Sequence, residues 1–384
     1  MRQNWVKHTL AATAASLFGM GMAQADTIKI GVNEPLTGVV AAAGTHVVNG
    51  AKIAADVINA KGGINGKKIE LVIEDNKSNP TEAANATEKL IVRDKVPVIM
   101  GAWSSTYTLA AMPKLMEYKV PMVVETSSAD KITTSGNPYI FRISPTNGME
   151  AVNFEKYVDP LNIKKADFLV VNNDWGLGAA MAYKETLKKK GKAVGKTEIM
   201  DASAQDMSAQ LSSLKSSDAD TLFITTGVEQ MVLVLKQAQT LGLKRQIITT
   251  GGTVPDQLIE QAGTAANGSM HDVFFAPWFP ELSADPEAAK NFIAEWKKRG
   301  LNPVGMSEAA RGYDGIITIA AAIEKAGKAE PDAIRKALWD VQINGLTGKV
   351  AFKKVGPKGK ESGQSAPDLH LMGINNGKVV PVKF

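Results

Sequence analysis

Two short segments rich in hydroxyl side chains each follow a run of apolar residues that is typical of a buried strand. They span residues 101–107 (Gly-Ala-Trp-Ser-Ser-Thr-Tyr) and 125–129 (Glu-Thr-Ser-Ser-Ala). Where a parallel strand leads into a helix, free backbone N–H groups and nearby hydroxyls can hold an anion such as a carboxylate. Serine and threonine at such places also cap helices without binding anything, so the residues alone leave both interpretations open. The candidate binding residues in these segments are Trp103, Ser104, Ser105, Thr106, Thr126 and Ser128.

An aromatic residue stands at a similar place later in the chain. Residues 172–178 (Asn-Asn-Asp-Trp-Gly-Leu-Gly) follow another apolar run and open a predicted helix. Trp175 would either form an apolar wall against a ligand or pack within the core or between domains. Gly176 and Gly178 match part of a dinucleotide-binding motif, but Met181 stands where the third small residue is needed, so we reject that interpretation.

The residues needed for common catalytic and metal sites are missing or scattered. The chain has no cysteine, which excludes disulfides, thiolate metal sites and a cysteine nucleophile. Of its four histidines, His8 is near the start, and His46, His271 and His370 are far apart, without metal-ligand spacing. Neither a Gly-x-Ser-x-Gly elbow nor a Gly-x-x-x-x-Gly-Lys phosphate loop is present. We therefore expect no enzymatic activity, no cofactor and no metal.

The first 25 residues have the pattern of a secretory signal peptide. Arg2 and Lys7 precede a short apolar run at residues 9–22, and residues 23–25 (Ala-Gln-Ala) form a cleavage signal. The run is shorter than the roughly 20 residues that a membrane span needs. We expect cleavage before Asp26 and export to the periplasm, because no cysteine is available for an N-terminal lipid anchor.

Composition favours a globular protein of about two domains, since the 384 residues are 44% hydrophobic and 22% charged. The net charge of +5 falls to +3 when the leader is removed, and the basic residues are interspersed with acidic ones. A nucleic-acid-binding protein would concentrate its Lys and Arg in a patch or stripe. We expect no nucleic-acid partner.

After residue 26, short β-rich runs alternate with amphipathic helical stretches. The strands are expected at 27–32, 69–73, 96–100, 121–124, 168–171, 221–224 and 246–249, with a final pair at 368–373 and 379–382. Helices are expected at 47–58, from 79 and 105 onward, and at 177–190, 209–216, 229–241, 289–298, 307–326 and 332–339.

Repeated β-α-β units of this kind specify a parallel sheet with helices on both faces. Because the rhythm restarts near residue 143, the fold class is α/β with two doubly wound lobes and a ligand cleft between them. The expected division is 1–25 for the signal peptide, 26–143 with 275–349 for the first lobe, and 144–274 with 350–384 for the second.

Three segments, at residues 30–38, 58–66 and 101–106, resemble the leucine/isoleucine/valine-binding proteins of ABC transporters. The Asn-Ala-Lys-Gly-Gly-Ile turn in the second segment is the most specific of them. The resemblance spans the whole mature chain and implies a type I periplasmic binding fold whose two lobes close on a solute. It also implies an ABC permease in the membrane as partner, a monomeric state and no catalysis.

The resemblance implies roles for individual residues. Ser105 is similar to the serine that holds the ligand carboxylate, and Thr126 and Ser128 to the pair on the neighbouring loop. Trp175 matches an aromatic wall and Tyr313 another aromatic beside the cleft, while Trp103 lies next to the carboxylate loop.

Two departures concern the ammonium group of an amino-acid ligand. Gly251 stands where the family has an acidic residue that pairs with this ammonium, and Gly227 stands near the place of an expected aromatic. A buried ammonium without a counter-charge is unfavourable. We therefore expect a small carboxylate, aromatic or organic, as the solute, with a branched-chain or other amino acid as the alternative. In that case Glu229 or Glu125 would replace the missing acid.

Two other functional classes remain open from the sequence alone. One is a periplasmic hydrolase with a similar α/β fold, which turnover of ester or amide substrates would reveal. The other is a sensory ligand-binding module that acts through a separate membrane receptor.

Overall fold

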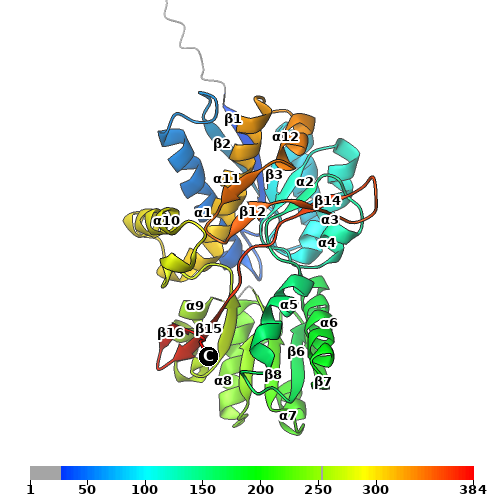
Figure 1. Ribbon diagram of the computed structural model, residues 1–384, viewed down its shortest axis with the longest axis vertical. Helices are drawn as coiled ribbons and strands as arrows, with labels where there is room; N and C mark the ends of the chain where they lie inside the picture. Colours follow the sequence, from blue (N-terminus) through cyan, green and yellow to red (C-terminus); the bar gives the residue numbers. More distant parts are fainter. Residues whose placement is uncertain (1–26, 252–253) are drawn as a thin grey trace, which may run out of the picture.

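The computed structural model describes residues 27–251 and 254–384, so the predicted signal peptide at 1–25 lies outside the described residues. The protein has two α/β lobes, stacked along the long axis of the molecule (Figure 1). Each lobe contains a seven-stranded, mainly parallel sheet covered by helices, and a separate two-stranded ribbon completes the described sheets. This confirms the predicted α/β class with two doubly wound lobes.

The first lobe contains the sheet β13-β14-β5-β4-β3-β1-β2. Its strands are β1 (Ile28–Glu34), β2 (Ile69–Asp75), β3 (Ile99–Gly101), β4 (Met122–Val124), β5 (Ile140–Arg142), β13 (Lys353–Val355) and β14 (Ser362–Gln364). Its helices are α1 (Ala41–Ala60), α2 (Pro80–Val92), α3 (Ser105–Tyr118), α4 (Lys131–Thr134), α10 (Pro286–Lys298), α11 (Met306–Ala326) and α12 (Pro331–Leu338). The ribbon of β11 (Gln342–Asn344) and β12 (Lys349–Ala351) packs against the core of this lobe through Val350 and Ile343.

The second lobe contains the sheet β16-β15-β10-β9-β8-β6-β7. Its strands are β6 (Lys165–Val171), β7 (Ala193–Met200), β8 (Thr221–Thr225), β9 (Gln246–Thr249), β10 (Met270–Val273), β15 (His370–Asn375) and β16 (Lys378–Pro381). Its helices are α5 (Asn147–Val158), α6 (Asp174–Lys189), α7 (Ser208–Lys215), α8 (Val228–Thr240) and α9 (Pro255–Ala262). The 3₁₀ turn η1 (Gly263–Ala266) follows α9 in this lobe. Two further 3₁₀ turns, η2 (Pro280–Leu282) and η3 (Pro303–Gly305), precede and follow α10 along the chain.

Local sequence signals start several of these elements where they were predicted. At the start of α2, the Asn79 side chain accepts hydrogen bonds from the backbone N–H groups of Thr81 (2.8 Å) and Glu82 (3.2 Å), and Pro80 occupies the first helical position. The strands β5, β7 and β10 to β14 and the helices α4, α5 and α9 were not predicted as elements. None of the helices in the described residues is both long and apolar enough to cross a membrane.

Close contact between α1 and α11 builds the core of the first lobe. A Cβ on Gly50 would lie 1.8 Å from the carbonyl oxygen of Ala309, and one on Gly312 would lie 2.0 Å from that of Val47. Only glycine allows these two backbones to touch. These contacts hold the helix α11 at a fixed distance from α1, and they therefore also fix the position of the α11 residues that reach the site.

The chain passes between the lobes after β5, after β10 and after β14 (Figure 1). The predicted boundary at residue 350 is wrong, because β13 and β14 belong to the sheet of the first lobe. Gly363 pairs with Phe141 and Gln364 with Arg142 in parallel register. The sequences Lys-Lys-Val and Ser-Gly-Gln contain too few apolar residues to give a strand pattern. Only the later strands β15 and β16 join the second sheet.

Candidate ligand-binding site

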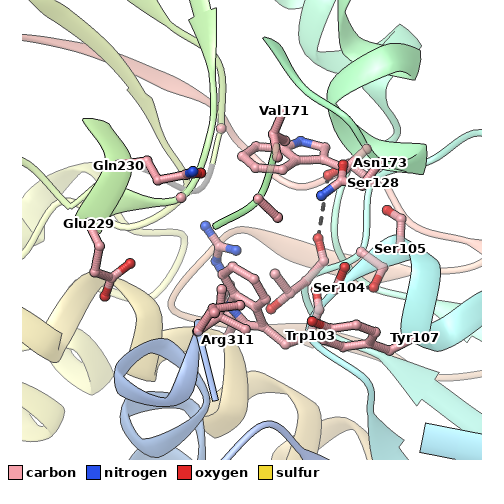
Figure 2. Close-up of a pocket in the computed structure, with 18 of the residues that line it drawn as sticks. Trp103, Ser104, Ser105, Tyr107, Ser128, Val171, Asn173, Glu229, Gln230 and Arg311 are labelled. Atoms are coloured by element: carbon pink, nitrogen blue, oxygen red, sulfur yellow. Dashed lines mark hydrogen bonds between the residues drawn. The ribbon is translucent and has the colours of Figure 1, made fainter. Parts of the chain in front are cut away.

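A pocket lies between the lobes, where parallel strands of both sheets end (Figure 2). It encloses about 760 Å³, including the part open to solvent, a size typical of small-molecule sites. The first lobe contributes Val39, Val40, Trp103, Ser104, Ser105, Tyr107, Thr126, Ser127, Ser128 and Arg311. The second contributes Val171, Asn173, Trp175, Ala202, Gly227, Glu229, Gln230, Gly251 and Phe274. Most of these residues come one to four positions after a strand, as expected for an open parallel sheet.

The two hydroxyl-rich segments meet at this pocket. Ser104 stands at the N-cap position of α3, but its side chain makes no capping hydrogen bond. Ser105 Oγ accepts a hydrogen bond from the backbone N–H of Ala129 at 3.0 Å, which joins the two segments. The hydroxyl proton of Ser105 remains available to a ligand, because a hydroxyl both donates and accepts. The helix-capping interpretation therefore fails for Ser104, and the start of α3 opens onto the pocket.

The second hydroxyl-rich segment is fixed from behind by Arg142, which is fully buried. Its guanidinium donates hydrogen bonds to the carbonyl oxygens of Ser127 (3.0 Å) and Ala129 (2.8 Å), to Thr133 Oγ1 (2.7 Å) and to Gln364 Oε1 (2.7 Å). Charge-assisted bonds of this kind are short and directional. They hold the loop after β4 in one shape, with Thr126 and Ser128 in the pocket wall.

The second-lobe wall is formed mainly by apolar and small residues. Trp175 lies in the first turn of α6, whose start is capped by the Asn173 side chain accepting from Gly176 N–H at 2.9 Å. The carbonyl oxygen of Trp175 accepts a hydrogen bond from Asn147 Nδ2 at 3.3 Å. Trp175 thus lies in the wall of the pocket, which Val171 also lines.

Gly251 has no room for a side chain. A Cβ at this position would lie 2.7 Å from Phe274 Cζ and 3.0 Å from Glu150 Oε2. Its backbone N–H donates to Glu150 Oε2 at 3.3 Å, while Glu150 Oε1 accepts from Ser128 Oγ at 2.8 Å. The buried carboxyl of Glu150, from α5, therefore occupies the space beside Gly251. Gly227 differs, since a Cβ there would approach only Glu229 Oε2, at 3.8 Å.

Eight of the ten predicted site residues line the pocket, and two do not. Those that line it are Trp103, Ser104, Ser105, Thr126, Ser128, Trp175, Gly227 and Gly251. Thr106 Oγ1 instead donates to Asp174 Oδ2 at 2.8 Å, which links α3 to α6 across the lobes. Tyr313 faces away from the pocket and packs edge-on against Phe292, with ring centroids 5.4 Å apart.

The residue of α11 that does reach the pocket is Arg311, which the sequence reasoning missed. Residues two apart on a helix point to nearly opposite faces, so Arg311 takes the place in the pocket wall that was expected for Tyr313. Arg311 is only 5% exposed, and its guanidinium lies 4.3 Å from the ring centroid of Phe274. A lone basic residue within a stretch of small and apolar residues (Ala309, Ala310, Gly312) was the available signal.

Three buried carboxyl groups lie behind this wall in the first lobe. Glu34 Oε2 accepts from the backbone N–H of Trp103 at 3.3 Å, and Glu308 Oε2 accepts from Trp103 Nε1 at 3.4 Å. Burial raises the pKa of Glu125 to about 7 and that of Glu34 well above its ordinary value. Burial also raises the pKa of Glu308, and the nearby Arg311 opposes that rise.

One acidic residue, Glu229, lines the pocket itself. It stands in the first turn of α8, and burial raises the pKa of its carboxyl. Figure 2 shows this carboxyl turned away from the guanidinium of Arg311. It faces the smaller space that Glu308, Gln257 and Val254 also line.

Comparison with known proteins gives the family of this fold and site. Residues 27–377 match the periplasmic binding protein family, and the chain belongs to it. A Leu/Ile/Val-binding protein of Rhizobium johnstonii is 32% identical over 91% of this chain and 93% of that protein. The chain is therefore a periplasmic ligand-binding protein of the ABC-transporter type, and the predicted resemblance is confirmed.

Two solved structures of similar chains contain different classes of ligand. The branched-chain amino acid transporter substrate-binding protein of Streptococcus pneumoniae, in complex with isoleucine, is 28% identical, with a TM-score of 0.80 over 92% of this chain and 98% of that one. An ABC-transporter solute-binding protein of R. palustris, in complex with 4-hydroxybenzoate, is 26% identical, with a TM-score of 0.79 over 94% and 96%. Chains of similar identity to this one thus contain an amino acid in one case and an aromatic acid in the other.

Proposed function

We propose that this protein captures a small carboxylic acid with a flat or apolar body and delivers it to an ABC permease. The observation that carries this proposal is the distribution of charge around the pocket. The first-lobe wall offers hydroxyls, the start of α3 and the cation of Arg311. Facing them, Gly251 has no side chain to meet an ammonium, and the Glu150 carboxyl beside it is buried and already accepts from Ser128 and Gly251. Trp175 and Phe274 supply apolar surface.

The proposal includes the cellular setting and the mode of action. The protein is exported, loses residues 1–25, works as a monomer and closes its lobes on the solute without transforming it. The three chain segments that join the lobes are consistent with a hinge between them. Mass spectrometry of the secreted chain would test cleavage before Asp26, and a smaller radius of gyration on adding solute, by small-angle scattering, would test closure.

The decisive experiment compares an acid and an amino acid of the same shape. Phenylpyruvate and phenylalanine are titrated into ligand-free protein by calorimetry, and phenylpyruvate is expected to bind more tightly. The amino acid would place an ammonium beside Gly251, where the adjacent carboxyl is that of Glu150, whose neutral form burial favours, so hydration would be lost without full compensation. Tighter binding of phenylalanine would overturn the proposed ligand class.

The carboxylate site is tested separately with Ser105→Ala. A hydrogen bond to a charged group contributes roughly 1.5–3 kcal/mol, so affinity for phenylpyruvate should fall by about tenfold or more. The melting temperature without ligand should also fall somewhat, because the buried backbone N–H of Ala129 loses its acceptor, so affinity is measured well below the unfolding transition. Unchanged affinity would show that the carboxylate binds elsewhere.

An amino-acid ligand is the second candidate, and one observation favours it. Glu229 lines the pocket and supplies a carboxyl group that could reach an ammonium once its side chain turns. Under this alternative, Glu229→Gln would weaken binding of phenylalanine or leucine by tenfold or more and leave phenylpyruvate binding intact.

A further inference from the structure

Arg311 is a buried cation whose hydrogen-bonding capacity is almost unused. A guanidinium carries five N–H donors. Among the described residues, Nε of Arg311 has no hydrogen-bond acceptor, and the closest charged partner is Glu308, whose Oε2 lies 3.4 Å from Nη1. Buried donors without acceptors are unfavourable. The guanidinium is therefore poised to bind a group that enters the pocket.

The neighbouring carboxyl groups do not fill this need. The same oxygen of Glu308, Oε2, also accepts a hydrogen bond from the indole N–H of Trp103 at 3.4 Å, so it is not available to Arg311 alone. Burial favours the neutral forms of Glu125 and Glu150, the other acids close enough to interact with Arg311. The stacking of the guanidinium on the Phe274 ring, 4.3 Å away, fixes its plane without using its N–H groups.

The place of Arg311 sets it apart from the hydroxyl-rich wall. Figure 2 shows Arg311 on one side of the pocket, with its guanidinium pointing inward, and Ser104 and Ser105 on the other. It is the only cation among the described lining residues. The tight glycine contacts between α1 and α11 hold its backbone in place. The pocket thus has two separate groups of donors, and apolar side chains such as Phe274, Trp175 and Val171 also line it.

We propose that Arg311 binds a second carboxylate of the ligand, so that the solute is a dicarboxylic acid with an apolar middle. This rests on the proposed function, in which the hydroxyl-rich wall holds the first carboxylate. Arginine suits the role because its planar fork matches both oxygens of a carboxylate. The apolar residues that line the pocket would accept a ring or a short methylene chain.

The test uses acids that differ in one end group. Terephthalate is compared with 4-methylbenzoate, which replaces the second carboxylate by a methyl group of similar size, and adipate with hexanoate. Dissociation constants are measured by calorimetry on the full-length mature protein. In the wild type, the diacid of the better-binding pair should bind at least about tenfold more tightly than the monoacid. A ratio near one would overturn the proposal.

Variants then assign the effect to Arg311. Arg311→Met, which keeps much of the side-chain volume, should bring the diacid-to-monoacid affinity ratio close to one. Tyr313→Phe, on the same helix but outside the pocket, is the matched control and should retain the wild-type ratio. Where Arg311→Met fails to fold, Arg311→Lys decides, because loss of the fork should lower the ratio at least about threefold. A wild-type ratio in either Arg311 variant would refute the second carboxylate site.

The same titrations separate this proposal from the one on which it rests. If neither member of either pair binds and phenylalanine or leucine does, the proposed ligand class fails, and the second carboxylate site fails with it. If monoacids and diacids bind equally well, the carboxylate-binding function stands and only the role of Arg311 is wrong.

Discussion

The two walls of the pocket are built in different ways. The first-lobe wall is polar, and its loops are fixed by buried side chains such as Arg142 and Ser105. The second-lobe wall offers backbone, glycines and aromatic surface, and its shape depends on close packing around Gly251. Under the proposed function, this difference assigns recognition of the ligand's carboxylate to the first lobe and recognition of its shape to the second. Closure of the lobes would then bring both walls onto one ligand.

The largest loss of stability is expected when Arg142, which holds the polar wall of the first lobe in place, is replaced. Arg142→Met removes a fully buried cation and its hydrogen bonds to the carbonyl oxygens of Ser127 and Ala129, which keep only the Ser144 hydroxyl (3.2 Å) and the Ile132 backbone N–H (3.1 Å) as donors. Breaking such a buried network costs about 3–5 kcal/mol, and ligand affinity should fall as the loop after β4 loosens. Urea unfolding and calorimetry measure both.

The matched control for this substitution is Arg93→Met, because Arg93 is exposed and pairs only with Glu74 and Asp94 at the surface. Arg93→Met should lower the free energy of unfolding by less than about 1 kcal/mol. Equal losses in the two variants would mean that the polar wall does not depend on a buried scaffold.

The shape of the second wall is tested by two glycines. Gly251→Ala places a Cβ within 2.7 Å of Phe274 Cζ, so overpacking should cost about 1–3 kcal/mol and weaken ligand binding. Gly227→Ala adds the same methyl group where the closest atom is Glu229 Oε2 at 3.8 Å, and it should be tolerated. Measured melting temperatures and affinities that change alike in both variants would contradict this view of the wall.

A carboxyl group that touches both walls should make stability depend on pH. Burial raises the pKa of Glu150 to about 7, with a further rise from Asp272 and an opposing effect of Arg311. Between the ordinary value near 4.5 and about 7, the folded protein holds a proton that the unfolded chain releases. The free energy of unfolding therefore falls as pH rises through this window, by up to roughly 1.4 kcal/mol per pH unit for one group.

Glu150→Gln removes this contribution, so its stability curve should be flatter than that of the wild type between these pH values. Glu125 and Asp272, whose pKa values burial also raises to about 7, retain their share of the slope in both proteins. Glu185→Gln, at an exposed position of α6, is the control and should leave the slope unchanged. Parallel curves for Glu150→Gln and the wild type would refute the assignment.

The smallest effect is expected where the walls meet at the surface. Asp174 accepts from Thr106 Oγ1 at 2.8 Å and pairs with Lys131 Nζ at 2.5 Å, which joins the lobes beside the pocket. Asp174→Asn should weaken ligand binding about two- to fivefold, mainly through faster dissociation, because exposed ion pairs contribute up to about 1 kcal/mol. Stopped-flow tryptophan fluorescence measures the rate.

Asp218→Asn is the comparison for this variant, since Asp218 pairs with Lys165 within the second lobe alone. It should leave the dissociation rate as it is. If both substitutions act alike, the contact at Asp174 does not hold the lobes closed.

Much of the fold and about half of the pocket follow from local sequence patterns. Strand-to-helix loops place Ser105, Thr126 and Trp175, because strand ends converge at one edge of each sheet. The remaining residues depend on tertiary contacts. Arg311 reaches the pocket through the depth of α11, set by glycine contacts far along the chain, and Glu150 reaches Gly251 through the packing of α5. No pattern in the neighbouring sequence carries that information.

The return of the chain to both lobes near its end bears on how the protein acquires its fold. β14 pairs with β5, which lies more than half the chain earlier, and β15 pairs with β10. Until these last strands have been synthesised, β5 and β10 are open sheet edges with unpaired backbone groups. Pairings over such distances form slowly. Both lobes therefore stay incomplete for most of the chain's synthesis, and exposed strand edges of this kind are the features that make unfinished chains prone to aggregate. The two sheets are completed only after the C-terminal segment has left the ribosome.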